Sequence, residues 1–415
     1  MNKLIVVMID GVSADYFKNN RVKLPHLSKL AKEGFVVERL HSITPATSLP
    51  GRTTMMTGVT CDKHGAWGNT IWDGKQFRYA TPYDVIAPSL PQKAMDTGLD
   101  VAVMGYGMLR PDEARVFRHP WWVGEMIQRG RDNSPKHAQD GWIKTKNHQD
   151  TSGRLESLFE QGFMLGTPDA YRSSPNPELN YFSAELAGDA VMLQWSAALA
   201  TSEKAPDFII TEVLTPDSIQ HKTGYDSLLS HWSIMYSDAL VGQLVASLNQ
   251  GGRDDYNLAI MSDHGHMPVK QVIHPDVLIP DVDYAMESGW LYVSYQSQSK
   301  LKEIGTKLIE HGVELSDGTQ IPEIYKGEIA AFIAPEATTF EPVMGDASGE
   351  PIGQPYTVSS HGFRPGTLGD DRFCVFYGPD VKQGSIASAE AIQIMPTLAS
   401  ILGLEKNSKG SLPIF

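Results

Sequence analysis

Short apolar runs recur along the chain, with segments of helical patterning between them. The runs fall at 4–9, 101–104, 208–213, 258–263 and 373–378. Each is nearly continuous in apolar residues rather than alternating with polar ones, which is typical of strands buried on both faces. Helical patterns precede or follow them at 25–34, 52–57, 87–97, 182–201, 227–249 and 390–402. This alternation predicts an α/β fold with a doubly wound, mostly parallel sheet and helices on both of its faces.

Two stretches break the alternation. Residues 110–200 are dense in Pro, Trp, Arg and His, and residues 275–355 hold the strand-like run WLYVSY, the helical run KLKEIGTKLIEHG and a return rich in Gly and Pro. Such segments are typical of loops and insertions rather than of a repeating βα core. We therefore predict a catalytic core at 1–274 and 356–415 with an insertion at about 110–200, and a small α+β cap subdomain at 275–355.

Composition narrows the class of protein. With 415 residues, the chain exceeds the size at which a single core stops growing, so one enlarged domain or two domains are expected. The 35 Lys and Arg against 49 Asp and Glu give a formal charge of −14, which argues against a surface for nucleic-acid polymers or anionic membranes. Only Cys61 and Cys374 occur, which excludes a disulfide framework and a thiolate metal site, and we expect both to be ordinary buried thiols.

The first residues, MNKLIVVMIDG, carry an apolar run that is too short for a signal peptide and ends in a carboxylate. We expect a buried first strand there. No run of about 18 apolar residues occurs elsewhere, so we predict no membrane span and a cytoplasmic location.

Candidate ligand residues follow three of the predicted strands. Asp10 ends the run at 4–9, Asp217 and His221 lie just past 208–213, and Asp263 with His264 ends the run at 258–263. Because open α/β sheets form their sites at the carboxyl ends of strands, these side chains should meet at one edge. A further histidine, His361, occurs in the motif SSHG.

Each ligand residue also has a simpler explanation. Asp10 can start a turn, His264 can be a structural histidine, and Asp217 can cap a helix. Taken together, three carboxylates and three imidazoles are the count for two three-ligand zinc sites, each with an open position. We therefore predict a hydrolase with two zinc ions, which manganese or another divalent ion can partly replace.

The order of IDG, a hydroxyl-bearing turn, TPDSIQH, MSDHG and SSHG resembles the nucleotide pyrophosphatase/phosphodiesterase branch of the alkaline phosphatase superfamily. The resemblance covers about residues 3–105, 206–270 and 355–404. It implies one zinc held by Asp217, His221 and His361. It implies a second zinc held by Asp10, Asp263 and His264, which also contacts the nucleophile.

The resemblance also sets the nucleophile, which in the family lies two residues before a proline and nine before the threonine of a Thr-Gly pair. Counting from Pro50 and from Thr57 gives Ser48 both times, with Thr47 as the second choice. The implied reaction attacks phosphorus with Ser48 and passes through a phosphoserine. A position at a helix amino terminus would favour the phosphoryl oxygens.

Two positions depart from the family, which usually has threonine as the nucleophile and asparagine just after the proline. Here these residues are Ser48 and Gly51, and Arg52 follows in SLPGR, which is similar to the sulfatase turn. A guanidinium at Arg52 can bind a phosphate monoester or a sulfate through two hydrogen bonds. Sulfatases of that type bind calcium through oxygen ligands, whereas imidazole suits zinc, so a sulfatase is the minor alternative.

The remaining candidates concern the substrate pocket. Asn69 matches a family asparagine that contributes to the phosphate site, although a loop amide bonded to the backbone is an equal alternative. The aromatic and basic segment 118–131 either lines the leaving-group pocket or buries a Trp pair, and His64 and His266 are interpreted as structural or supporting residues.

The sequence thus predicts a hydrolase of small-molecule phosphodiester, pyrophosphate or phosphonate ester bonds, and sets no oligomeric state. Phosphomonoesterase or sulfatase is the alternative enzyme, and a metal-stabilised binding protein is the alternative without catalysis.

Overall fold

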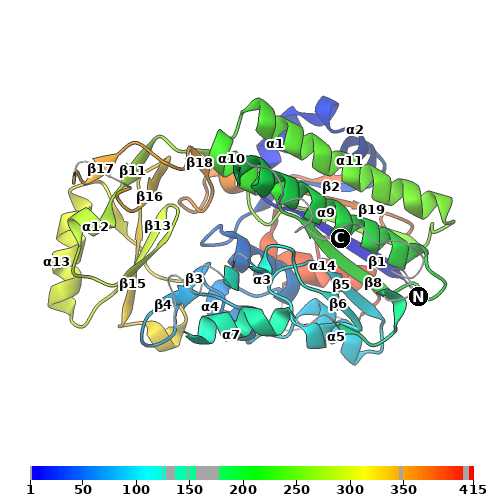
Figure 1. The fold of residues 1–415 in the computed structure, drawn as a ribbon, viewed down its shortest axis with the longest axis horizontal. Coiled ribbons are helices and arrows are strands. Elements are labelled where there is room, and N and C mark those ends of the chain that lie inside the picture. Colours follow the sequence, from blue (N-terminus) through cyan, green and yellow to red (C-terminus); the bar gives the residue numbers. More distant parts are fainter. Residues whose placement is uncertain are drawn as a thin grey trace.

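A computed structural model gives the fold of the chain. It describes residues 2–124, 126–127, 136–146, 149–155, 177–344, 349–404 and 411–415. A large sheet with helices on both faces forms one part of the molecule, and a smaller set of sheets stands beside it (Figure 1). Parts of the predicted insertion at 110–200, namely 125, 128–135, 147–148 and 156–176, lie outside the described residues, as do 345–348 of the predicted cap.

The large sheet has the strand order β20-β2-β19-β9-β1-β8-β5-β6-β7, with β21 paired to β2. Its strands are β1 (Lys3–Ile9), β2 (Phe35–His41), β5 (Val101–Met104), β6 (Val116–Arg118), β7 (Gln149–Asp150), β8 (Phe208–Val213), β9 (Tyr256–Met261), β19 (Arg372–Tyr377), β20 (Gly384–Ile386) and β21 (Ala389–Glu390). The centre, β9-β1-β8-β5-β6, is parallel throughout. The predicted doubly wound, mostly parallel sheet is confirmed.

Two strands differ from what the apolar runs suggest. The run at 373–378 forms β19, which is antiparallel to both β9 and β2. The pattern does not predict β2, because Glu38 and Arg39 interrupt its apolar residues. An apolar run indicates burial and not direction, so the sequence of β19 carries no signal for its orientation.

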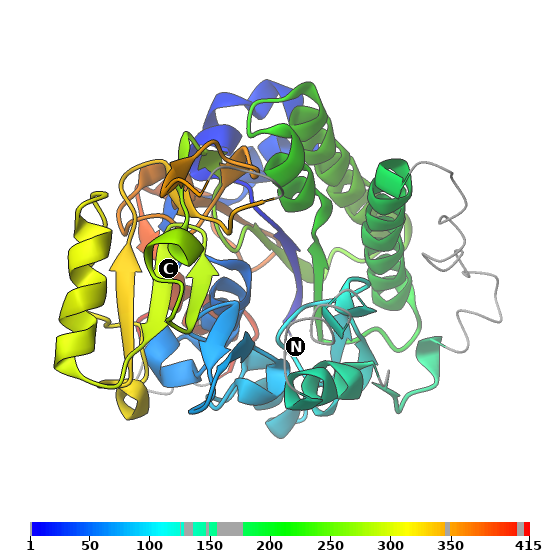
Figure 2. The same cartoon turned by 60° about the vertical axis from the view of Figure 1, so that its left-hand side comes forward.

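The helices lie on both faces of this sheet (Figures 1 and 2). Strand β1 explains why, since its alternate side chains enter two separate cores: Ile5 and Val7 on one face, Val6 and Met8 on the other. The first core is covered by α1 (Ala14–Asn19), α2 (Pro25–Glu33), α9 (Pro177–Thr201) and α11 (Leu228–Gln250). The second is covered by α3 (Ser48–Thr57), α5 (Leu90–Asp96) and α14 (Ile394–Ile401).

The segment after β9 forms smaller sheets. A four-stranded sheet has the order β12-β13-β15-β14, and α13 (Gln298–Ile309) packs on one of its faces. Its strands are β12 (Tyr284–Glu287), β13 (Trp290–Ser294), β14 (Glu314–Leu315) and β15 (Ile329–Ile333). The other face packs against the region of α4 (Cys61–His64), β3 (Thr70–Trp72) and β4 (Phe77–Tyr79), which Figure 2 draws in blue beside the yellow strands.

Short ribbons join this sheet back to the core. The sheet β16-β11-β17 consists of β11 (Gln271–Ile273), β16 (Thr338–Phe340) and β17 (Ile352–Gly353), and it lies near the short helix α12 (Pro275–Leu278). The pair β10 (Met267–Pro268) and β18 (Ser359–Ser360) returns the chain to the large sheet. The cap boundary at 275–355 stays a prediction. Helix α7 (Lys136–Thr145) lies within the predicted insertion at 110–200.

Candidate active site

The predicted ligand residues gather at the carboxyl edge of the central strands. Asp10 follows the last residue of β1, and Asp263 and His264 follow β9 after one serine. After β8 the chain enters α10 (Thr215–Thr223), which carries Asp217 in its first turn and His221 one turn later. His361 comes from a different part of the chain, directly after β18. The three strand-end clusters and SSHG therefore meet, as the sequence predicted.

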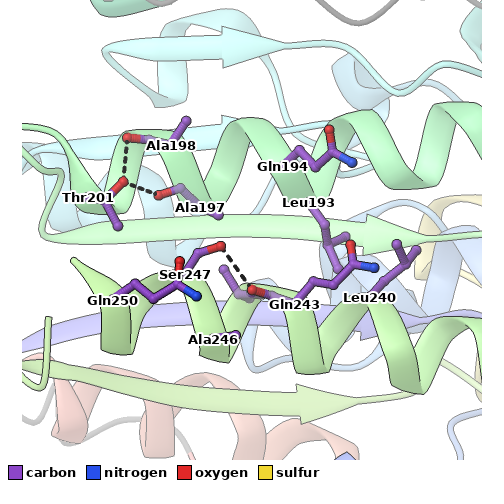
Figure 3. A pocket seen from close by; sticks show the side chains of 11 residues that line it. Leu193, Gln194, Ala197, Ala198, Thr201, Leu240, Gln243, Ala246, Ser247 and Gln250 are labelled. Carbon is purple, nitrogen blue, oxygen red and sulfur yellow. Dashed lines mark hydrogen bonds between the residues drawn. The ribbon is translucent and has the colours of Figure 1, made fainter. Parts of the chain in front are cut away.

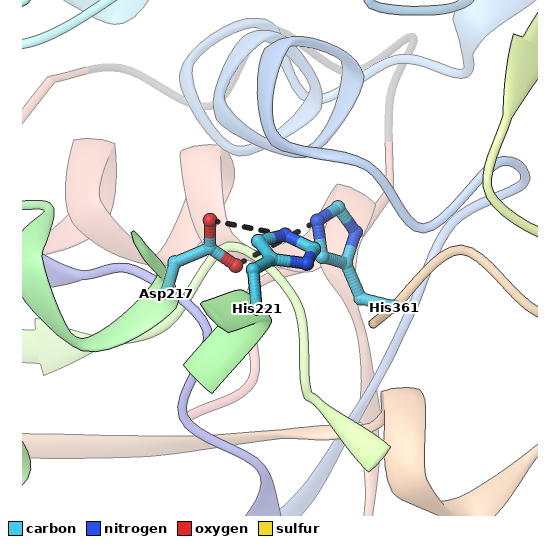
Figure 4. A group of neighbouring side chains, drawn as sticks. All are labelled: Asp217, His221 and His361. Atoms are coloured by element: carbon cyan, nitrogen blue, oxygen red, sulfur yellow. Dashed lines mark ion pairs between the residues drawn. The ribbon is translucent and has the colours of Figure 1, made fainter. Parts of the chain in front are cut away.

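One group consists of Asp217, His221 and His361 (Figure 4). Both imidazoles turn their Nε2 atoms toward the Asp217 carboxylate, at 3.3 Å from Oδ2 for His221 and 3.6 Å from Oδ1 for His361. The Oδ1 atom of Asp217 is buried and accepts no hydrogen bond. Two imidazole nitrogens and a carboxylate that converge in this way can hold a divalent metal ion.

The second group is centred on His264. Its Nε2 atom lies 3.1 Å from Oδ1 of Asp10 and 3.8 Å from Oδ2 of Asp263. The ligand atoms of Asp10, Asp217 and His264 lie within 4.8 Å of one another, so Asp217 borders both groups. Asp263 is turned slightly away, because its Oδ1 accepts the backbone N–H of His264 at 3.1 Å and its Oδ2 faces Arg52.

The three ligand histidines share one orientation device. Each Nδ1 lies at hydrogen-bond distance from a backbone carbonyl: Ser359 for His221 at 2.9 Å, Gly265 for His264 at 2.8 Å and Ala46 for His361 at 2.9 Å. A donated Nδ1–H leaves the lone pair on Nε2, the atom that faces the carboxylates. Histidines that bind metals are commonly oriented in this way. The donor set therefore fits divalent metal ions of the zinc type.

Electrostatics at this edge favour a cation. Burial and the neighbouring Asp263 raise the pKa of Asp10 to about 8. Burial opposes the charge of Asp217, yet His221, His266 and His361 hold its pKa well below the ordinary value. Buried oxygens on Asp10, Asp217 and Asp263 accept no hydrogen bond in this structure. Buried carboxylates of this kind are normally paired with cations or protons, and a bound metal ion would provide the pairing.

Ser48 is the first residue of α3 and is half-buried, whereas Thr47 before it is 1% exposed. The Ser48 hydroxyl lies 3.0 Å from Nε2 of His264. A hydroxyl in the first turn of a helix lies where unpaired N–H groups and the helix dipole favour anions. The Ser48 hydroxyl therefore lies beside the predicted ligand cluster.

The neighbouring glycine explains one departure from the family pattern. A Cβ atom on Gly51 would lie 2.6 Å from the backbone oxygen of Asp263, which is too close for any side chain without a shift of that backbone. Helix α3 therefore packs directly on the loop that carries Asp263. The asparagine usual after the proline does not fit here.

Asn69 also lies at this helix end. Its side-chain oxygen accepts the backbone N–H of Leu49 at 2.9 Å, so it caps α3 from another part of the chain. The bond to backbone, one of the two alternatives that the sequence leaves open for Asn69, is observed, and a contribution to the phosphate site stays a prediction.

The structure corrects the interpretation of Arg52. Its side chain is 2% exposed and is paired with Asp10, with Glu212 at 3.3 Å and with Asp263 at 3.4 Å. Although burial disfavours its charge, Glu212 and Asp10 raise the pKa of Arg52 above the ordinary value. The guanidinium is directed at carboxylates of the protein and not at an open position beside Ser48. Helix α3 points this side chain inward, which a one-dimensional motif does not reveal.

In the Trp pair of segment 118–131, Trp122 is buried, and Trp121 is partly buried against the same core. The Trp122 indole N–H donates to Glu212 at 2.5 Å, and the Trp121 indole N–H donates to Asp189 at 3.0 Å. Asp189 in turn accepts the backbone N–H groups of Leu214 and Thr215, where α10 begins. Residues 128–131 of the segment lie outside the described part of the chain.

The other two histidines differ from each other. His64 has both ring nitrogens bonded inside the protein, to the Thr54 hydroxyl at 2.9 Å and to the backbone N–H of Ala66 at 3.2 Å. His266 lies with Nδ1 at 2.6 Å from the Ser359 hydroxyl and with Nε2 at 3.5 Å from Asp217. His64 therefore has a structural position, whereas His266 lies against the carboxylate of Asp217.

Two buried carboxylates near the site were missed by sequence reasoning. Glu212 is 2% exposed inside β8, and a charged residue within an otherwise apolar strand was a usable signal. Glu287 is 4% exposed at the end of β12, and no motif marks it.

A groove of about 460 Å³ lies elsewhere, between α9 and α11 (Figure 3). It is lined by leucines together with small and amide side chains, among them Leu193, Ala197, Gln243 and Ser247. None of the predicted site residues lines it. Within the described ranges, no helix is both long and apolar enough to cross a membrane.

The doubly wound α/β sheet and the set of aspartates and histidines at its edge are typical of hydrolytic enzymes that bind divalent metal ions. Comparison with known proteins specifies this class. Residues 4–338 match the family described as Type I phosphodiesterase / nucleotide pyrophosphatase. The chain belongs to this family, whose members are metal-dependent enzymes.

Relatives and solved structures agree with that assignment. Bis(5'-adenosyl)-triphosphatase enpp4 of Mus musculus is 22% identical over 422 residues, covering 97% of this chain and 78% of the relative. A pyrophosphatase/phosphodiesterase of Schizosaccharomyces pombe, described as uncharacterised, is 23% identical and covers 72% of this chain and 52% of its own. The murine ectonucleotide pyrophosphatase / phosphodiesterase 5, solved as an inactive variant with AMP, has a TM-score of 0.68 at 17% identity, covering 99% of this chain and 98% of that one. This last likeness supports the alkaline phosphatase-like fold.

Proposed function

We propose that this enzyme cleaves a phosphodiester, pyrophosphate or phosphonate ester bond in a small molecule, with Ser48 as the nucleophile. The observation that carries the proposal is the place of the Ser48 hydroxyl, half-buried at the amino terminus of α3 and 3.0 Å from Nε2 of His264. A nucleophile next to metal ligands and a helix terminus suits phosphoryl transfer, where positioning and charge stabilisation do most of the work.

We propose that two divalent ions, zinc first and manganese as a partial substitute, bind at this edge. Asp217, His221 and His361 would hold one of them. Asp10, Asp263 and His264 would hold the other, with Ser48 beside it. Bound there, such ions would supply charge neutralisation and lower the pKa of a coordinated hydroxyl or water.

The chain itself positions the reacting groups. The Ser48 hydroxyl gives up its proton, and Oγ forms a bond to phosphorus while the bond to the leaving oxygen breaks. That oxygen departs with the electron pair and takes up a proton, so that the leaving group is released as an alcohol or acid. Water then hydrolyses the phosphoserine and restores the hydroxyl. Asn69 keeps its oxygen on Leu49, which leaves the NH₂ end of its amide able to donate to a phosphoryl oxygen. The first turn of α3 favours the negative charge of the transferred group.

Nucleotide substrates are the favoured class within this proposal. The murine relative is named for hydrolysis of a bis(5'-adenosyl) triphosphate, and the murine structural neighbour was solved with AMP. The bis(5'-adenosyl) triphosphate and AMP are both small molecules that contain a nucleoside and a phosphate group. We propose the same class of substrate here.

The position of Arg52 removes the main support for the two alternative enzymes, a phosphomonoesterase and a sulfatase. A phosphomonoesterase or sulfatase gains from an added cation facing the transferred group, and Arg52 was the candidate for that role. Its guanidinium is instead enclosed by three carboxylates. A metal-stabilised binding protein is separated from all of these by testing whether any ester is hydrolysed.

The decisive experiment compares rates on nitrophenyl esters of a phosphate diester, a phosphate monoester, a phosphonate and a sulfate. These substrates share one leaving group and differ at the transferred centre. We expect the diester or the phosphonate monoester to react fastest and the sulfate slowest. A preference for the phosphate monoester of more than about tenfold, or about 1.4 kcal/mol in transition-state stabilisation, would favour a phosphatase.

A further inference from the structure

The turn between β12 and β13 lies between two loops that carry residues of the site. On one side, the backbone N–H of Gly289 donates to the carbonyl of Gly362 at 3.1 Å, directly after His361. On the other side, the Glu287 carboxylate accepts the backbone N–H groups of Asn69 at 2.9 Å and Thr70 at 2.6 Å. The turn therefore connects the loop of a ligand histidine with the loop of Asn69.

Glu287 is an unusual residue to bury. Its side chain is 4% exposed, and in the part of the chain that the structure describes no Lys or Arg forms an ion pair with it. The polar groups that face it are the two N–H groups, the Thr47 hydroxyl and the Thr70 hydroxyl, and the charge of Glu287 also acts on the buried Tyr292. Burial raises the pKa of Glu287 to about 7. A buried carboxylate without a cation is costly, so hydrophobic packing alone does not account for it.

The carboxylate suits its two partners, because each of its oxygens accepts one of the two adjacent N–H groups, Oε2 from Asn69 and Oε1 from Thr70. It thereby fixes the peptide planes at Asn69 and Thr70. The Asn69 side chain then caps Leu49, the second residue of α3, at 2.9 Å. Ser48 is the residue just before. An unbroken series of hydrogen bonds thus leads from the β12–β13 turn to the nucleophile end of the helix.

We propose that Glu287 is a positioning residue for this enzyme: through the Asn69 loop it holds the amino terminus of α3, and with it the Ser48 hydroxyl, in the reactive place. The proposal rests on the proposed role of Ser48. It assigns to the β12–β13 segment a part in the reaction that does not require contact with substrate. Displacement of a nucleophile by a fraction of an ångström lowers turnover more than it lowers binding.

The test is Glu287→Gln, which keeps the shape of the side chain but replaces one acceptor oxygen with an NH₂ group. One of the two backbone N–H groups then faces a donor. We expect kcat on a nitrophenyl phosphodiester to fall at least about tenfold and KM to change less than about threefold. Metal content should stay that of the wild type. Glu287→Asp, which restores the carboxylate with a shorter reach, should recover part of the lost kcat.

A matched control exists in the same segment. Glu341 also accepts two neighbouring backbone N–H groups, from Tyr356 at 2.9 Å and Thr357 at 3.1 Å, but has no link to Asn69. Glu341→Gln should leave kcat within about twofold of wild type. Amide exchange gives a readout without activity: peptides that cover 48–50 and 69–70 should exchange about tenfold faster in Glu287→Gln and unchanged in Glu341→Gln.

A pH profile separates positioning by the ionised carboxylate from a purely structural role. Above the pKa of Glu287 both oxygens accept, and below it the protonated wild type resembles the Gln variant. The ratio of wild-type to Glu287→Gln kcat should therefore rise from about pH 6 to about pH 8. A flat ratio would contradict the proposal. Equal kcat losses in Glu287→Gln and Glu341→Gln, or unchanged exchange at 48–50, would also overturn it.

Failure of the proposed function gives a different pattern. If Ser48→Ala retained turnover, Ser48 would not be the nucleophile, while the exchange data would still report whether Glu287 fixes α3. If Glu287→Gln failed to fold, Glu287→Asp and its exchange pattern would carry the test. Wild-type exchange at 48–50 in the Asp variant, together with a kcat loss, would contradict the proposed link.

Discussion

Two neighbouring parts of the site lie at the same edge of the sheet, one around Asp10 and Asp263 and the other around Asp217, and they differ in what balances the charge of their carboxylates. Around Asp10 and Asp263, the protein supplies its own cation, the buried guanidinium of Arg52. Around Asp217, the neighbours are His221, His266 and His361, and no Lys or Arg is paired with it among the described residues. We infer that the Asp217 group depends more on a metal ion and should bind it more tightly than the Asp10 group.

The largest expected effect comes from removing the internal cation. Arg52→Met would leave Asp10, Glu212 and Asp263 buried without their guanidinium, and breaking a buried ion pair on one side typically costs about 3–5 kcal/mol. Denaturant unfolding should detect this loss in metal-free protein, and added zinc should restore part of it. Arg52→Lys keeps the charge and should lose less. Equal stability of wild type and Arg52→Met without metal would contradict the assignment of Arg52 as a structural cation.

A smaller effect is expected at His266, which lies against Asp217 but outside its ligand group. His266→Gln removes the ring that orients this carboxylate, and loss of such a supporting residue typically lowers metal affinity about 10–100-fold. Titration with a zinc chelator should show this loss for one ion per chain and not for two. Affinity unchanged at both ions would show that Asp217 is held without His266.

The effect that is smallest near neutral pH, and that grows only in acid, concerns His64, whose ring nitrogens are both bonded inside the protein. Burial lowers the pKa of His64 to about 3, far below the ordinary value of 6.5. The unfolded chain therefore binds more protons at this residue between these values, so stability falls as pH drops below about 6.5, by up to about 1.4 kcal/mol per unit. His64→Gln should flatten that part of the unfolding profile and leave metal content unchanged. An unchanged slope in the variant would assign the acid sensitivity to other groups.

The residues that directly follow strands can be predicted from the sequence more easily than the buried residues that pair with them. The ligand residues follow strands directly, and the strand-end rule brings Asp10, Asp217 and Asp263 to one edge from the sequence alone. Ser48 and Asn69 come from a family pattern rather than from chemistry alone. The predicted sheet is confirmed because continuous apolar runs mark buried strands. Most of the predicted helices are confirmed because helical patterns occur between those runs.

The residues that sequence does not reveal act over long separations. Arg52 is adjacent in sequence to the nucleophile turn, yet its partners Glu212 and Asp263 are set by the inward direction of one helix position. Glu287 meets Asn69 only because the β12–β13 turn packs against the loop before β3. Such contacts depend on how elements pack, and a single sequence carries no local signal for them.

The most direct test of the central claim is Ser48→Ala, assayed for phosphodiester turnover and for metal content on the same preparation. We predict that turnover is abolished while the protein retains close to two metal ions per chain, because the six ligand side chains remain. Thr47→Ala serves as the control for the register of the nucleophile, and it should keep most of the activity. A Ser48→Ala protein that still turned over the diester at most of the wild-type rate would contradict the claim.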